Sequence, residues 1–224
     1  MLDALGMPYT TVSPDDVAGL RLRPEQLLII NCPGYIGARG VSCVRAFVEG
    51  GGSLFTTDWA LRHVIEPAFP GVLAYNERPT ADDVVRIEIR SRANSFLAGV
   101  IEPGDDPQWW LEGSSYPIRV LDPARVEVLL TSDELAARYG EPAVAVLFRH
   151  GAGEVFHMIS HYYLQRTELR TARHGAAASA YAASNGVADG ADLAGLAVGD
   201  VESAASSARL LANVVAAKKR AVRR

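Results

Sequence analysis

The residues with the clearest capacity for chemistry are Thr57, Asp58 and Trp59, which end a short apolar run that follows three glycines. The pattern predicts a buried strand over residues 53–57 and a sharp turn into a helix that begins near residue 59. In open α/β sheets such a turn displays its apex residue beside the crevice where ligands bind and nucleophiles act. Asp58 could attack there as a covalent nucleophile if a base stood beside it. It could also cap the following helix by accepting hydrogen bonds from the free amides.

Histidine and cysteine side chains could support chemistry at the same edge of the sheet. His161 follows a late apolar run and could activate water against an ester formed on Asp58. Cys32 ends another apolar run, where a helix amino terminus would lower the pKa of its thiol, although small buried cysteines at strand ends are commoner. A metal site would need His157 and His161 to share one ion, but at ~3.3 Å per residue of strand they lie ~13 Å apart. We therefore expect no metal site.

The elements that position these residues alternate between strand and helix signals. Residues 27–32 form a continuous apolar run, typical of a strand buried on both faces of a parallel sheet, and apolar residues at helical spacing follow over residues 41–48. This alternation favours an α/β fold, doubly wound, with right-handed crossovers and a mainly parallel sheet. Residues 84–90 alternate apolar with charged side chains, and residues 143–148 and 154–159 predict a hairpin. We therefore expect antiparallel additions near the C-terminal half.

The beginning of the chain lacks one expected element. Residues 1–5 predict the last turn of a helix, residues 9–12 a short strand, and residues 13–16 the start of another helix. A doubly wound domain normally opens with a strand that takes a central place in the sheet. The missing strand is therefore upstream, lost or supplied by another chain, and the sequence does not distinguish among these.

Length and composition divide the chain into three parts. Residues 1–171 predict one α/β domain, residues 172–200 a flexible low-complexity segment, and residues 201–224 the closing helix and basic tail of the same domain.

The net charge of -4 argues against nucleic acid as a partner. No run approaches the ~20 apolar residues of a membrane helix. We expect the two cysteines, Cys32 and Cys43, to be reduced thiols. We expect a cytoplasmic protein with no membrane partner.

The order of these parts resembles the class I glutamine amidotransferase-like superfamily, in its trehalose-utilisation-protein-like branch. The matching pieces are the strand that ends in Cys32-Pro33-Gly34, the helix that ends in three glycines, the turn at Thr57-Asp58-Trp59, and the late hairpin that leads to His161. The resemblance implies a flavodoxin-like fold, an oxyanion loop at Pro33-Gly34-Tyr35 and a late catalytic histidine at His161.

The resemblance fails at the catalytic residues themselves. Active members carry a cysteine at the turn, between flanking glycines, whereas Thr57 or Asp58 stands in that place here. Active members also carry an acid shortly after the late histidine, and here no acid follows His161 until Glu168. Two of the three triad roles are therefore unfilled, and we do not expect glutaminase activity.

These observations predict a pseudoenzyme: a non-catalytic binding or scaffold module that uses no cofactor. Its partner would be another protein, a second copy of the chain, or a small ligand in the former active-site crevice. The residues expected to line that crevice are Cys32, Gly34, Tyr35, Thr57, Asp58, Trp59 and His161. The alternative is a hydrolase with an altered nucleophile, in which Asp58 attacks and His161 acts as the base.

Overall fold

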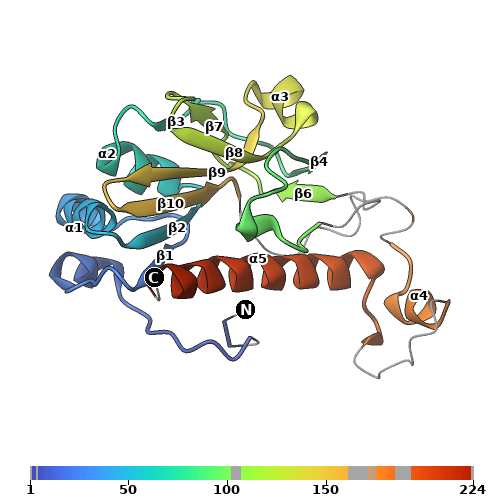
Figure 1. The fold of residues 1–224 in the computed structure, drawn as a ribbon. Helices are drawn as coiled ribbons and strands as arrows, with labels where there is room; N and C mark the ends of the chain where they lie inside the picture. The colour runs from blue at the N-terminus through green and yellow to red at the C-terminus, as the bar shows by residue number, and fades with distance from the viewer. Residues whose placement is uncertain are drawn as a thin grey trace.

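A central β-sheet organises the fold, with a long helix along one of its faces (Figure 1). The computed structural model describes residues 2–3, 5–101, 107–160, 172, 175–184 and 193–222. The long helix is α5 (Val198–Val222), and the helix α1 (Gly37–Glu49) packs against two of the central strands. The side chains of Leu54, Val144 and Phe156 are almost completely buried in the core.

The described part of the main sheet has three parallel strands at one edge, and antiparallel strands extend it from there. The strands of this sheet are β1 (Leu27–Ile30), β2 (Ser53–Thr57), β3 (Leu73–Tyr75), β5 (Glu88–Ile89), β7 (Ile118–Val120), β8 (Val126–Thr131), β9 (Ala143–His150) and β10 (Gly153–Met158). A second sheet consists of β4 (Asp83–Arg86) and β6 (Gln108–Leu111). The order is β1-β2-β10-β9-β7-β3, with β8 beside β9 and β5 beside β8. The strands β1, β2 and β10 run parallel. The expected α/β, flavodoxin-like fold is confirmed, although antiparallel pairing begins already at β3, earlier in the chain than expected.

The remaining helical segments are short. They are η1 (Pro14–Gly19), the π-helical segment η2 (Leu61–Ile65), α2 (Glu66–Ala68), η3 (Ser95–Leu97), α3 (Asp133–Tyr139) and α4 (Ala178–Ser184). α4 lies within the stretch that the sequence predicts as a low-complexity segment, and α5 begins at Val198. Residues 161–171, 173–174 and 185–192 lie outside the described residues.

The glycines after α1 permit a close approach between this helix and the sheet. A Cβ atom at Gly52 would lie 2.2 Å from the ring of Phe47, and a Cβ atom at Gly153 would lie 2.2 Å from the carbonyl oxygen of Val48. A larger residue at Gly52 would displace the Phe47 ring, and one at Gly153 would displace the backbone of α1 or of the glycine turn. These contacts fix where β2 leaves the glycine turn, and so where its far end presents Thr57.

The first residues of the chain differ from the prediction. Residues 2–3 and 5–6 form turns where the end of a helix was expected, and residues 9–12 form no strand. The β-branched residues within residues 9–12 favour a strand, but a strand forms only where a neighbouring strand provides backbone hydrogen bonds. The predicted helix after Ser13 is the short 3-10 segment η1, in which the Ser13 side chain makes no capping hydrogen bond.

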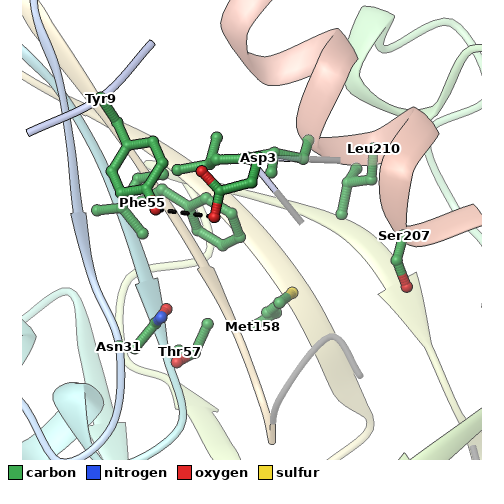
Figure 2. A pocket seen from close by; sticks show the side chains of 11 residues that line it. Asp3, Tyr9, Asn31, Phe55, Thr57, Met158, Ser207 and Leu210 are labelled. Carbon is green, nitrogen blue, oxygen red and sulfur yellow. Dashed lines mark hydrogen bonds between the residues drawn. The ribbon is translucent and has the colours of Figure 1, made fainter. Parts of the chain in front are cut away.

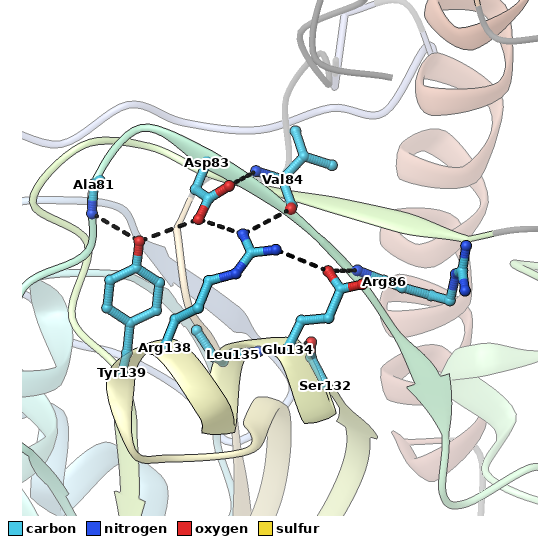
Figure 3. Close-up of polar contacts among 9 residues, drawn as sticks. All are labelled: Ala81, Asp83, Val84, Arg86, Ser132, Glu134, Leu135, Arg138 and Tyr139. Carbon is cyan, nitrogen blue, oxygen red and sulfur yellow. Dashed lines mark hydrogen bonds and ion pairs between the residues drawn. The ribbon is translucent and has the colours of Figure 1, made fainter. Parts of the chain in front are cut away.

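A cluster of polar contacts joins α3 to β4 (Figure 3). The Arg138 guanidinium pairs with Asp83, and the Tyr139 hydroxyl donates to the same carboxylate at 3.2 Å. Glu134 accepts a hydrogen bond from the Arg86 backbone amide at 3.1 Å. The Ser132 side chain caps α3 by accepting from the Leu135 amide at 3.1 Å. α3 is therefore fixed to the edge of the second sheet.

Candidate functional site

The turn between β2 and η2 places Asp58 at its apex. The Asp58 backbone has φ 48°, a conformation that few residues other than glycine adopt and that Asp tolerates better than most. Its amide donates to the Met158 carbonyl at 2.9 Å, and its own carbonyl accepts from the Leu61 amide at 2.8 Å. The chain therefore turns sharply at the carboxyl end of a parallel strand, where the sequence predicts the elbow.

The Asp58 carboxylate is engaged by a loop far away in the sequence. Its Oδ1 accepts a hydrogen bond from the Tyr116 amide at 2.8 Å, and its Oδ2 accepts one from the Ser115 hydroxyl at 3.2 Å. The residue is 3% exposed. The prediction that Asp58 caps the following helix is wrong, because these bonds go to the loop between β6 and β7 and η2 has no side-chain cap.

Cys32 lies beside the turn but is not an activated thiol. Its backbone amide donates to Thr57 Oγ1 at 3.2 Å, which joins the ends of β1 and β2. Burial raises the pKa of the Cys32 thiol, a hydrogen bond from the Trp59 backbone opposes this effect, and the carboxylates of Asp58 and Glu112 raise the pKa further. The alternative in which a helix terminus lowers the pKa of this thiol is therefore wrong, since desolvation outweighs the favourable hydrogen bond.

The loop at Pro33-Gly34-Tyr35 packs directly against the start of the segment that follows the turn. Gly34 has φ 77°, and a Cβ atom on it would lie 3.0 Å from the Ala60 Cβ. Tyr35 is 57% exposed, and its ring meets the His63 ring edge to face at 4.3 Å. Burial lowers the pKa of His63, and the nearby Arg62 lowers it further.

A stack of three aromatic rings continues from Trp59, which is the only one of the three among the predicted site residues. Trp59 stacks on Tyr116 at 5.4 Å between ring centroids, and Tyr116 stacks on Tyr75 at 3.9 Å. The Trp59 indole N–H donates to the Ser114 carbonyl at 2.7 Å, which fixes its ring. The Arg62 guanidinium lies over Tyr75 at 5.8 Å from the ring centroid. No local signal in the sequence marks Tyr75 or Tyr116 as neighbours of Trp59.

The described residues thus bring together six of the seven predicted site residues, namely Cys32, Gly34, Tyr35, Thr57, Asp58 and Trp59. The seventh, His161, lies outside the described residues. Within the described ranges, no three His, Cys, Asp or Glu side chains are placed to hold a metal ion. No helix in that part of the chain has the length and apolar character to cross a membrane.

Comparisons with known proteins find similarity in structure but not in sequence. No family model matches the chain, and no curated protein matches it. A cytoplasmic protein from Salmonella typhimurium shares 12% identity over 74% of this chain and 75% of that chain, with a TM-score of 0.48. A GMP synthase-like protein from Thermoplasma acidophilum shares 12% identity over 70% of this chain and 72% of that chain, with a TM-score of 0.46.

Solved glycosidases also match the chain over part of their length. An exo-β-1,4-mannosidase from Opitutaceae bacterium strain TAV5 shares 14% identity over 61% of this chain and 21% of that chain, with a TM-score of 0.41. The matched part thus spans about a fifth of the length of that enzyme.

Proposed function

We propose that this chain is a non-catalytic relative of the class I glutamine amidotransferases that binds a small ligand at the carboxyl edge of its parallel strands. Thr57 or Asp58 stands where active members of the family carry the catalytic cysteine, and the two carboxylate oxygens of Asp58 accept hydrogen bonds from Tyr116 and Ser115. A buried carboxylate held in this way connects two segments and is not placed to attack. This engagement of Asp58 is the observation that supports the proposal most.

The surroundings of Asp58 favour binding over catalysis. The one thiol beside the turn, Cys32, has a raised pKa, which keeps it protonated and poorly nucleophilic near neutral pH. The half-exposed ring of Trp59 and the exposed ring of Tyr35 border the same region. Aromatic rings fixed by their neighbours bind ligands with little loss of side-chain freedom. We propose the cytoplasm as the compartment, in keeping with two free cysteines.

One observation favours a second function, a hydrolase with an altered nucleophile. Asp58 has φ 48° at the apex of a strand-to-helix turn, a strained conformation of the kind that nucleophiles adopt in α/β hydrolases. In that reaction the Asp58 carboxylate would displace the leaving group of the substrate, such as bromide from an alkyl bromide to give an ester or the amine or alcohol from an acyl group to give an anhydride. His161 would then take a proton from the water that hydrolyses this intermediate and restores the carboxylate.

Turnover assays separate the two functions. The wild-type protein and an Asp58→Asn variant would be incubated with L-glutamine, p-nitrophenyl acetate and 1-bromobutane. We expect equal rates for both proteins with each substrate, because Asp58 is a structural acceptor. A wild-type rate at least tenfold above that of Asp58→Asn with any of the three would favour the hydrolase.

Ligand binding itself would be observed at the Trp59 indole N–H by nuclear magnetic resonance. Its signal would be assigned from a Trp59→Phe variant, and the protein would then be titrated with a library of polar fragments. We expect at least one fragment to shift the Trp59 signal without being consumed, while the indole signals of Trp109 and Trp110 serve as controls. A Trp59 signal that no fragment shifts would argue against a binding site here.

A further inference from the structure

A cavity of about 190 Å³ lies between α5, the sheet and the first residues of the chain (Figure 2). The sheet contributes side chains from the ends of its three parallel strands, including Phe55, Thr57 and Met158. Of the predicted crevice residues within the described part of the chain, only Thr57 lines this cavity. It is therefore a site separate from the one proposed above.

The inner wall of the cavity is apolar and well packed. Six of the eleven lining residues are apolar, namely Leu2, Ile29, Phe55, Met158, Leu210 and Leu211. Met158 and Leu210 are at most 1% exposed, so this wall is held in place by the core. An engineered protein cavity of ~150 Å³ with similar walls binds benzene. The volume here therefore suits one aromatic ring with a short side chain.

The mouth of the cavity is acidic. Asp3 is the only charged residue among the described lining residues, and its carboxylate accepts a hydrogen bond from the Tyr9 hydroxyl at 3.0 Å. Tyr9 is 52% exposed, which places this pair at the solvent side. Figure 2 shows Asp3 and Tyr9 side by side, with the neutral polar residues Asn31 and Thr57 at a distance from them. A carboxylate at the entrance attracts a cation and repels an anion.

We propose that this cavity binds a small primary amine that carries one aromatic ring. The ring lies against Phe55, Met158 and Leu210, and the ammonium group pairs with the Asp3 carboxylate at the mouth. This arrangement buries the apolar part of the ligand and leaves its charge in a partly solvated position, where pairing costs little desolvation. The proposal goes beyond the ligand site at Trp59, because it rests on different residues.

The test compares three ligands of nearly equal size by isothermal titration calorimetry at pH 7: phenethylamine, 2-phenylethanol and 3-phenylpropionate. We expect the dissociation constant of phenethylamine to be about threefold lower than that of the neutral alcohol, since an exposed ion pair contributes little, and the anion to bind most weakly. Equal affinity for all three, tightest binding of the anion, or no binding of phenethylamine would each overturn the proposal.

Two charge-removing variants locate the effect. Asp3→Asn is expected to raise the dissociation constant of phenethylamine to that of 2-phenylethanol, because the exposed Asp3 can lose its charge without loss of folding. Asp15→Asn removes the same charge from an exposed position in η1, away from the cavity, and is expected to leave the affinity unchanged. Equal weakening by both variants would overturn the proposal. Asp58→Asn should bind phenethylamine as the wild type does, whatever the outcome at Trp59.

Discussion

At the scale of single residues, Asp58 connects the turn after β2 to the loop before β7. Its carboxylate accepts hydrogen bonds from the Tyr116 amide and the Ser115 hydroxyl, and both Asp58 and Ser115 are buried. Asp58→Ala would leave these donors without their acceptor in a place that water does not reach. Hydrogen bonds to charged groups contribute ~1.5–3 kcal/mol, so we expect the free energy of unfolding to fall by about 2 kcal/mol in urea titrations.

Asp58→Asn is the matched control for this variant. An amide oxygen can still accept from the Tyr116 amide, and Asn tolerates a positive φ as Asp does. We therefore expect a smaller loss of stability than with alanine. If Asp58→Ala unfolded at the same urea concentration as the wild type, the carboxylate would not be the connection described here.

His157 makes the stability of the fold depend on pH. The ring is fully buried on the side of β10 opposite Met158, its Nδ1 lies 2.8 Å from Thr56 Oγ1, and its Nε2 has no hydrogen-bond partner among the described residues. Burial lowers the pKa of His157 to about 3, from 6.5 in the unfolded chain. As pH falls, the unfolded state takes up the proton first. The contribution of the neutral His157 ring to the free energy of unfolding is therefore fully present above pH 6.5 and is lost progressively between pH 6.5 and 3.

The variant His157→Asn tests this dependence. Its amide can keep the contact with Thr56 but does not titrate, so its free energy of unfolding should change less between pH 7 and 4. The pKa difference from 6.5 to about 3 corresponds to about 5 kcal/mol for complete titration, as an order of magnitude. Urea titrations at pH 7, 6, 5 and 4 measure the two curves. Parallel curves would contradict the lowered pKa of His157.

At the scale of elements, the parts with regular periodicity were predictable from the sequence. The apolar run after three glycines predicts β2, helical spacing predicts α1, and the turn at Gly151 predicts the hairpin of β9 and β10. Each of these signals is local, because neighbouring residues determine whether a segment buries one face or two. The same signals predict the turn at Asp58, since a strand that ends where a helix begins must reverse there.

The partners of Asp58 were not predictable, because they are distant in the sequence. The strands β3 to β6 lie between Asp58 and these two residues in the sequence, and no spacing rule links residues that are 57 or 58 positions apart. The same limit explains the aromatic stack on Trp59 and the cavity beneath α5. The prediction of a strand over residues 9–12 was wrong for a related reason, since strand propensity has no effect where no neighbouring strand lies alongside.

The contact between α3 and β4 is expected to contribute little to stability. Arg138 pairs with Asp83 and with Glu134, but its side chain is 43% exposed (Figure 3). Exposed ion pairs contribute ~0.2–1 kcal/mol and weaken with salt. Arg138→Ala should therefore lower the free energy of unfolding by less than about 1 kcal/mol in low salt, and by less again in 1 M NaCl.

Arg23→Ala is the control for that experiment. Arg23 forms one long ion pair with Glu25, at 3.9 Å, and its side chain is 75% exposed. We expect no measurable change in stability from this variant. A loss of about 2 kcal/mol or more in Arg138→Ala, unaffected by salt, would mean that the cluster is not an ordinary surface network.

At the scale of the whole molecule, α5 joins parts of the fold that are far apart in the sequence. The Asn213 amide donates to the carbonyls of Phe96 and Ala98 at 2.9 and 2.8 Å, and Lys218 Nζ donates to the Gly51 carbonyl at 2.8 Å. Leu210, Leu211 and Val214 are buried along the same helix. The helix therefore covers one face of the sheet and also meets the glycine turn from which β2 emerges.

Lys218 provides the clearest test of how α5 is held. It is 7% exposed, whereas its neighbour Lys219 is exposed, so Lys218→Met and Lys219→Met remove the same charge from two different environments. Lys218→Met keeps an apolar stem but leaves the Gly51 carbonyl without this donor, at an expected cost of about 1–2 kcal/mol. Hydrogen exchange should therefore become faster over residues 210–222 in Lys218→Met and remain unchanged in Lys219→Met. If both variants exchanged at the wild-type rate, the bond from Lys218 to Gly51 would contribute nothing to the docking of α5.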